Sequence, residues 1–209
     1  MAYTAKTPPV PSPARPQRNE IMPQRPYYPQ ERSGLLHRES YGLIHVCFGQ
    51  GVGKTSRCIG LAVRAAGAGL DVTWVQFMKS GDSSEAEILR HTPGVTYRCP
   101  GKHPFILSGG PKSVHYEHAE SSLWLAKEAA KKGVTLLICD EILNTAVFGV
   151  LAKSQLLDLM DACRGRTELV MSGVDAAPEI IASADYVTEF IQRKHPYYSG
   201  HLARRGIEF

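Results

Sequence analysis

Hydrophobic residues follow two alternating patterns along this chain from residue 41 onwards. Short runs rich in β-branched and aromatic residues are typical of strands buried in a parallel sheet. They occupy residues 43–48, 72–77, 95–97, 134–139, 169–171 and 186–191. Helices are predicted where apolar residues recur three or four positions apart, at residues 56–66, 85–90, 115–132, 154–163 and 178–184. Strands that alternate with helices indicate an α/β fold with a mostly parallel sheet covered on both faces.

The first forty residues show neither pattern. Eight of the 14 prolines fall within the first thirty residues, which contain almost no Val, Ile, Leu or Phe. Such a segment cannot bury enough apolar surface to offset the conformational entropy lost on folding. We therefore predict a disordered Pro-rich tail over residues 1–40 and one folded domain over residues 41–209. The P-x-x-P spacings of the tail leave a polyproline ligand open, but a spacer is favoured because such matches are common in proline-rich stretches.

The positive charge of the chain is concentrated in the same segment. Residues 1–40 carry six Lys or Arg and three Glu, whereas the rest of the chain carries 18 basic and 17 acidic residues. A nearly neutral body argues against nucleic acid as a partner, because nucleic-acid binding needs a basic face. A membrane is excluded as well, since no apolar run approaches the ~18 residues of a span. The N-terminus also lacks the apolar core of a secretory signal.

Cysteine and histidine spacings indicate no dedicated metal site. The cysteines are odd in number and form no C-x-x-C pair: Cys47, Cys58, Cys99, Cys139 and Cys163. This usage is typical of a reducing compartment rather than of a disulfide framework or a structural zinc site, and it predicts a cytoplasmic protein. His103, His115 and His118 are expected at the surface, because their spacing matches no metal-binding pattern.

A glycine-rich sequence joins the first predicted strand to the first predicted helix. It reads Gly49-Gln50-Gly51-Val52-Gly53-Lys54-Thr55-Ser56. Glycines let the backbone curl so that successive N–H groups converge on phosphate oxygens, and the helix N-terminus favours the same anion. Lys54 would add a positive charge for the outer phosphates, and Thr55 would offer a hydroxyl to Mg²⁺. We predict that these eight residues form an ATP-binding phosphate loop, although its first glycine stands one place later than the common pattern, which would need a glycine at Phe48.

Two adjacent acids follow the strand predicted at residues 134–139. Asp140 and Glu141 directly after an apolar run form a Walker B arrangement. Asp140 is predicted to hold Mg²⁺ together with Thr55, and Glu141 to position a water, the metal or a nucleotide group. Acids also follow strands as helix N-caps, but their place downstream of a phosphate loop favours the metal site. Lys54 and Glu141 are therefore the predicted catalytic residues.

The end of the chain, residues 194–209, has no hydrophobic period but is dense in basic and aromatic residues. This ending and the shifted glycine loop carry a resemblance to a known family. Residues 42–209 resemble the P-loop type of ATP:cob(I)alamin adenosyltransferase, the corrinoid adenosyltransferases. Members are similar in the loop G-x-G-x-G-K-T and in V-Q-F-x-K, matched here by residues 75–79. They also share D-E-[LI] at residues 140–142, an S-G segment followed by P-E, and the ending K-H-P-[FY]-x-x-G-x-x-A-[RQ]-x-G-I-E-[YF].

The resemblance implies a three-layer P-loop NTPase-like (RecA-like) fold and an adenosyl transfer. Co(I) of cob(I)alamin or another reduced corrinoid attacks the C5′ carbon of ATP, tripolyphosphate leaves, and adenosylcobalamin forms. It further implies a flavoprotein electron donor, a homodimer, and an N-terminal segment over the corrinoid, for which residues 32–41 are the candidate. Two other functions stay open on the residues alone: a P-loop phosphotransferase or ATPase acting at the γ-phosphate, and a non-catalytic corrinoid- or nucleotide-binding regulator.

The corrinoid-binding residues are implied by the same resemblance. Some members carry an F-x-W pair before the long helix, which helps to expel the lower ligand of cobalt. This chain has residues 99–105 at that place, without the pair, and Phe105 is the candidate substitute. His195, Pro196 and Tyr197 of the C-terminal motif are the other candidates.

Deleting Met1–Gln30 is expected to leave the melting temperature nearly unchanged, because this segment carries no core-forming pattern. Thermal melts of the shortened and full-length chains measure the effect, and activity is assayed on the same samples. A drop of many degrees would contradict the prediction, whereas lost activity at unchanged stability would indicate a lid over the corrinoid.

Overall fold

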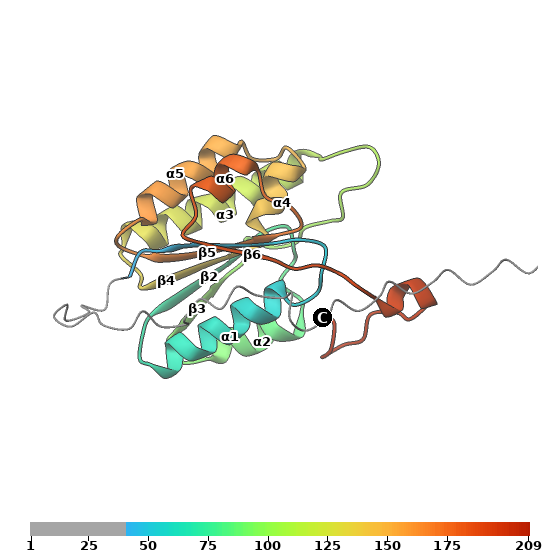
Figure 1. Cartoon of the computed structure of the whole chain (residues 1–209), viewed down its shortest axis with the longest axis horizontal. Helices are drawn as coiled ribbons and strands as arrows, with labels where there is room; N and C mark the ends of the chain where they lie inside the picture. The colour runs from blue at the N-terminus through green and yellow to red at the C-terminus, as the bar shows by residue number, and fades with distance from the viewer. Residues whose placement is uncertain (1–40) are drawn as a thin grey trace, which may run out of the picture. The chain divides into compact units, whose positions relative to one another are not determined.

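The computed structural model describes residues 41–209, so the predicted tail lies outside the described residues. These residues form a six-stranded, all-parallel sheet with the strand order β3-β2-β4-β5-β1-β6 (Figure 1). The strands are β1 (Ile44–Phe48), β2 (Val72–Gln76), β3 (Val95–Arg98), β4 (Leu136–Asp140), β5 (Glu168–Gly173) and β6 (Tyr186–Glu189). The helices are α1 (Lys54–Gly67), α2 (Ser84–His91), α3 (Ser113–Lys131), α4 (Ile142–Val147), α5 (Lys153–Cys163), α6 (Pro178–Ala182) and a short 3₁₀ helix (Pro196–Ser199).

Helices cover both faces of the sheet. Figure 1 shows α1 and α2 on one face and α3, α4, α5 and α6 on the other. Successive strand residues point to opposite faces, so each strand contributes to two cores. In β4, Leu136 and Ile138 pack in the core under α1, whereas Leu137 and Cys139 pack in the core under α3 and α5. This three-layer arrangement confirms the predicted α/β fold.

The hydrophobic pattern located the six strands and five of the six α-helices, with ends shifted at several elements. Helix α1 begins at Lys54 rather than at residue 56, because the glycine loop leads directly into it. Helix α4 was not predicted. It has only 6 residues, of which Ile142, Leu143, Asn144 and Thr145 are all buried. So short a helix, with its first four residues buried, shows no amphipathic period.

The strand order determines which side chains can meet at the edge where the parallel strands end. Strand β5 lies between β1, which leads into the glycine loop, and β4, which ends at Asp140. In this register Ser172 of β5 pairs with Cys47 of β1, and Gln76 of β2 pairs with Asp140. The carboxyl ends of parallel strands are where ligands bind in open α/β sheets. Ser172 and Gln76 are therefore carried to the same edge as the predicted acids.

The glycine loop packs closely against the residue that follows β6. The Phe190 N–H donates to the carbonyl of Phe48 at 2.7 Å, and the Gly51 N–H donates to the carbonyl of Phe190 at 2.6 Å. A Cβ at Gly51 would lie 2.7 Å from that carbonyl oxygen, and one at Gly49 would overlap it. Gly49 also has a φ of 117°, which L side chains rarely adopt. The glycines are therefore required by close packing as well as by the curl of the loop.

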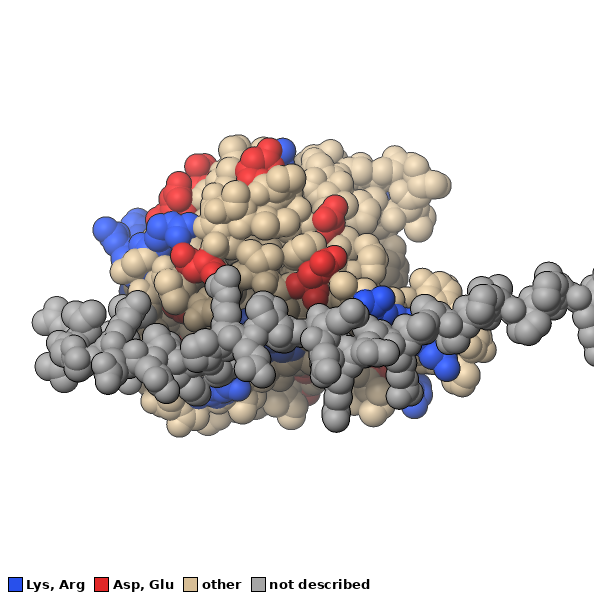
Figure 2. Space-filling view, in the orientation of Figure 1, with Lys and Arg blue, Asp and Glu red and all other residues tan. Residues whose placement is uncertain are grey.

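The surface carries both signs of charge. Figure 2 shows Lys and Arg side chains in small groups, with Asp and Glu groups elsewhere on the same face. Of the helices formed by residues 41–209, none combines the length and the apolar character that crossing a membrane requires.

Replacing Gly49 by alanine is expected to destabilise the fold, because the new Cβ would overlap the Phe190 carbonyl oxygen at a positive φ. Backbone strain of this kind costs about 1–3 kcal/mol even without the overlap. Gly60→Ala is the matched control, since Gly60 lies in α1 with open space around its Cβ position. Alanine there should stabilise the protein by about 0.5–1 kcal/mol. Urea unfolding measures both, and equal unfolding free energies for the two variants would contradict the packing role of Gly49.

Candidate active site

The lysine of the glycine loop folds back into the loop. Lys54 Nζ donates hydrogen bonds to the carbonyl oxygens of Gly49 at 2.7 Å and Gly51 at 2.8 Å. Burial lowers the pKa of Lys54, and the carboxylates of Glu141 and Asp140 oppose that shift. The loop thus holds a cation inside its curl, where its N–H groups would meet a phosphate.

The outer positions of the loop have a different character. Gln50, Val52 and Ser56 are exposed, so a nucleotide would meet them at the surface of the loop. Gly53 ends the loop with a φ of 112° and leads into α1. Of the eight predicted residues, 49–53 form the loop and 54–56 begin α1, so the loop presents the N-terminus of a helix, the arrangement that favours anions.

Asp140 lies at the centre of a hydrogen-bond network at the end of β4 and is fully buried, with 0% of its surface exposed. Its Oδ1 accepts from Ser172 Oγ at 2.7 Å and from Thr55 Oγ1 at 3.2 Å. Its Oδ2 accepts from Gln76 Nε2 and from Lys79 Nζ, both at 3.0 Å. The contact with Thr55 brings the glycine loop and the acidic pair together.

Glu141 is held beside this network in an unusual backbone conformation. Its φ of 65° places it in the left-handed region, which is uncommon for a residue with a side chain. Its N–H donates to Ser172 Oγ at 2.9 Å, and its carboxylate accepts from the side-chain amide of Asn144. Burial and the neighbouring charge of Asp140 raise the pKa of Glu141, although two nearby lysines oppose this shift. Such strained positions cluster at functional sites.

The oxygen atoms of Thr55, Asp140 and Glu141 fit a hard divalent cation. Mg²⁺ prefers carboxylate and hydroxyl oxygens, and it usually keeps several waters and phosphate oxygens in its shell. Within residues 41–209, no three His, Cys, Asp or Glu side chains form a group suited to holding a metal by themselves. A cation here would therefore complete its coordination with water and a nucleotide, as is usual for Mg²⁺.

Some side chains of the network were not predicted as site residues. Gln76 and Lys79 stand in the V-Q-F-x-K motif and Ser172 in the S-G segment, so the resemblance contained them without showing what they contact. Asn144 carries no comparable signal. Gln76, Lys79 and Ser172 contact Asp140 through the strand order, which the sequence pattern did not supply, whereas Asn144 contacts Glu141 locally, three residues along the chain.

The surface prediction is wrong for His115 and His118, whereas His103 is half-buried. His115 and His118 are buried, and the ring centre of His103 lies 5.0 Å from the first and 4.9 Å from the second. His115 Nδ1 accepts from the Lys112 N–H at 2.7 Å, and its Nε2 donates to the Pro104 carbonyl at 3.1 Å. Their spacing puts His115 and His118 on the buried side of α3, where their rings contact His103 in the loop that follows β3.

The candidate corrinoid-binding residues lie on two separate segments. Phe105 is 92% exposed on the loop between β3 and α3. His195, Pro196 and Tyr197 lie beyond β6, where His195 Nδ1 accepts from the Tyr197 N–H at 3.1 Å. In the part of the chain that the structure describes, no hydrogen bond or ring contact joins Phe105 to these three. Figure 1 shows both segments extending from the sheet edge at which the glycine loop lies.

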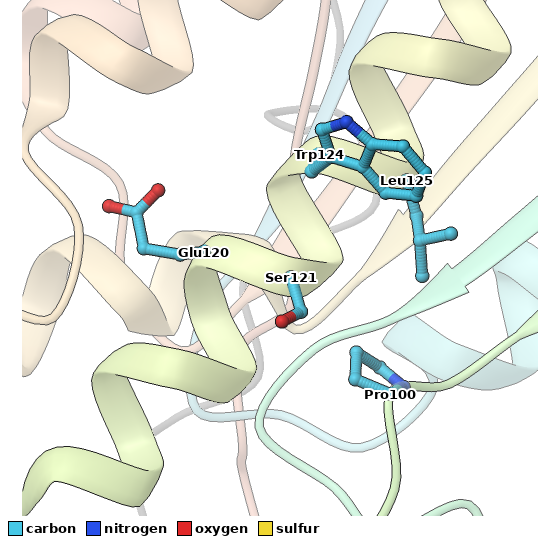
Figure 3. A pocket seen from close by; sticks show the side chains of 5 residues that line it. All are labelled: Pro100, Glu120, Ser121, Trp124 and Leu125. Atoms are coloured by element: carbon cyan, nitrogen blue, oxygen red, sulfur yellow. The ribbon is translucent and has the colours of Figure 1, made fainter.

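Two hollows in the surface are lined by neither Asp140 nor Glu141. The larger, of about 630 Å³, is lined by Pro100 and by Glu120, Ser121, Trp124 and Leu125 of α3 (Figure 3). The smaller, of about 280 Å³, lies between α4, α5 and α6. Neither is lined by a residue of the glycine loop. The candidate site is thus defined by side chains that contact one another, and not by a deep cavity.

A glycine loop that opens a helix, with a hydroxyl and a buried carboxylate behind it, defines a P-loop nucleotide-binding protein. The family model described as "ATP:corrinoid adenosyltransferase BtuR/CobO/CobP" matches residues 40–209. The chain belongs to this family, which confirms the resemblance that its motifs indicated.

Individual relatives agree with the family match. The corrinoid adenosyltransferase of Pseudomonas aeruginosa is 30% identical over 201 residues, covering 95% of this chain and 98% of that protein. The corrinoid adenosyltransferase CobA of Salmonella typhimurium is 25% identical over 178 residues, covering 82% of this chain and 88% of that protein. A corrinoid adenosyltransferase from Sinorhizobium is 27% identical over 184 residues, covering 86% of each chain.

Acidification is expected to destabilise the protein through the histidine cluster. Burial, helped by His118 and His115, lowers the pKa of His103 from 6.5 to about 4. Burial also lowers the pKa of His118, which the nearby carbonyls of Gly101 and Lys79 oppose only in part. Between the folded and unfolded pKa values the unfolded chain binds more protons, so stability is complete above about pH 6.5 and is lost as the pH falls towards 4.

Melting temperatures measured from pH 7 to pH 5 test this dependence. His118→Phe should flatten the slope because it removes one of the buried titrating rings. His91→Asn is the control, since the side chain of His91 is exposed, and it should leave the slope unchanged. An unaltered slope in His118→Phe would show that the cluster does not govern the acid response.

Proposed function

We propose that this protein transfers the 5′-deoxyadenosyl group of ATP to Co(I) of a reduced corrinoid, releasing tripolyphosphate and forming adenosylcobalamin. The observation that carries the proposal is the Thr55–Asp140 contact of 3.2 Å, which joins the glycine loop to the acidic pair in a chain of this family. Transfer of the γ-phosphoryl group would use the same loop and the same acids. Family membership favours adenosyl transfer over that alternative.

The glycine loop and its lysine suit a polyphosphate leaving group. In the proposed reaction the C5′–O bond of ATP breaks, the electron pair stays with tripolyphosphate, and cobalt forms the new bond to C5′. Lys54 and the N–H groups of the loop would neutralise the charge that builds up on the departing oxygens. The carbonyls of Gly49 and Gly51 already hold Lys54 in the loop, so little reorganisation is needed.

Thr55 and Asp140 are the proposed ligands of Mg²⁺, with Glu141 beside them. Mg²⁺ would supply Lewis-acid neutralisation of phosphate charge when bound. Hydrogen bonds from Ser172 and Gln76 fix the orientation of the Asp140 carboxylate. Glu141 is proposed to orient a water or a group of the nucleotide.

Co(I) is itself the nucleophile in this reaction, so the chain needs neither a nucleophilic side chain nor a general base. The five cysteines are free thiols. Burial is the main cause that raises the pKa of each thiol, for Cys163 to about 12. Protonated thiols are poor nucleophiles, which supports a reaction without cysteine chemistry.

Phe105, His195, Pro196 and Tyr197 are the proposed corrinoid contacts. The exposed rings of Phe105 and Tyr197 would bury apolar surface against a flat macrocycle. The proposal also places adenosyl transfer in a domain of residues 41–209. Residues 1–40 are proposed to be a tail, part of which covers the corrinoid. We further propose a flavoprotein electron donor, a homodimer and a cytoplasmic location. The free cysteines support the cytoplasmic location.

Lys54→Ala is expected to lower kcat/KM by about 10²–10³-fold, the usual effect of losing one donor to charge that develops in a transition state. The melting temperature should change little, because Lys54 is only half-buried and forms no ion pair among the described residues. Lys127→Ala, at an exposed position of α3, is the control and should keep full activity. Near-wild-type turnover in folded Lys54→Ala would exclude the loop assignment.

Product analysis tests the reaction itself. With ATP, Mg²⁺ and chemically reduced cobalamin, phosphorus NMR should show tripolyphosphate, and the absorbance should show a light-sensitive cobalt–carbon bond. Replacement of each cysteine by serine should leave this chemistry in place. ADP and phosphate formed in step with turnover would instead identify a phosphotransferase or ATPase. Binding of both substrates without turnover would identify a regulator.

A further inference from the structure

Lys79 places an ammonium group on the acidic pair. Its Nζ lies 3.0 Å from Asp140 Oδ2 and 3.5 Å from Glu141 Oε1. It also lies 3.4 Å from Thr55 Oγ1. These oxygens belong to the three side chains that fit Mg²⁺, so one lysine contacts the whole proposed ligand set.

The need for this cation follows from burial. Asp140 is fully buried and the Glu141 side chain is only 16% exposed, and buried carboxylates are costly unless a counter-charge stands close by. Burial by itself would lower the pKa of Lys79, but the charges of Asp140 and Glu141 outweigh it and raise that pKa. Lys79 is therefore a firmly charged partner of the pair.

We propose, on the basis of the function proposed above, that Lys79 is a resident counter-ion which competes with the divalent cation for Asp140 and Glu141. When metal and ATP enter together, Lys79 leaves the carboxylates and pairs with the polyphosphate. Metal binding is then weak without nucleotide and strong with it, because only the nucleotide brings the anion that receives the displaced ammonium.

The two partners differ in their freedom to move. Asp140 is fixed by Ser172 Oγ and Gln76 Nε2 as well as by Lys79, so the carboxylate stays in place when the lysine departs. The Lys79 side chain is 34% exposed, and a lysine carries its charge on a flexible four-carbon stem. The lysine is thus the member of the pair that can swing away, and an ammonium within reach of the metal ligands would repel a divalent cation.

Mn²⁺ binding, measured by electron paramagnetic resonance without nucleotide, tests the proposal directly. Lys79→Gln removes the resident charge and should bind Mn²⁺ at least about tenfold more tightly than the wild-type chain, a gain of about 1.4 kcal/mol. Its melting temperature should be lower without metal and should recover on Mn²⁺ addition. Lys127→Gln, which removes the same charge from an exposed position of α3, should behave as wild type. Lys79→Gln combined with Asp140→Asn should lose the gain.

Lys79→Arg provides a second test of the proposal if Lys79→Gln is poorly folded. Arginine retains the charge and can bind carboxylates with two parallel hydrogen bonds, so its Mn²⁺ affinity should be equal to or below that of the wild type. Equal Mn²⁺ affinity of wild type and folded Lys79→Gln, or tighter binding by Lys79→Arg, would overturn the role of Lys79. Tripolyphosphate release by the wild-type enzyme is measured separately, and its absence would contradict the proposed function whatever the Mn²⁺ result.

Discussion

The buried carboxylate of Asp140 is the group on which the rest of the site depends. A buried charge costs several kcal/mol unless protein groups replace the lost water, and here Ser172, Gln76, Thr55 and Lys79 do so. Their hydrogen bonds reach Asp140 from β5, from β2 and the residues after it, and from the start of α1. One desolvated carboxylate thus holds the ends of several elements in a fixed relation at the sheet edge.

The glycine loop satisfies a second constraint besides phosphate binding. Its backbone must approach the end of β6 closely enough for the Gly51 N–H to reach the Phe190 carbonyl, and a side chain at Gly49 or Gly51 would prevent that approach. Strand β6 carries no motif of its own. It still contributes to the site, because Phe190, the residue that follows it, accepts a hydrogen bond from the glycine loop.

Charge at the site is balanced before any ligand arrives. Asp140 and Glu141 face Lys79, and Lys54 is held by loop carbonyls close to both acids. The formal charges of these two acids and two lysines cancel, and the body of the chain is also nearly neutral. ATP adds several negative charges, so its binding favours a divalent cation in the same site and a rearrangement of the lysines. Such coupling between buried charges is strong because little water separates them.

The sequence by itself determined the elements and the motifs. Periods of two and of about 3.6 residues are local properties of the backbone, so the strands, the longer helices, the glycine loop and the Asp140–Glu141 pair could be predicted. The tertiary structure decided that β5 separates β1 from β4, and with it which side chains surround Asp140. It also buried His115 and His118, which were expected at the surface, beside the half-buried His103. These contacts join residues far apart in the chain, for example Gln76 to Asp140 across 64 positions and Ser172 to Asp140 across 32. No periodic pattern encodes strand order, because it arises from how whole layers pack.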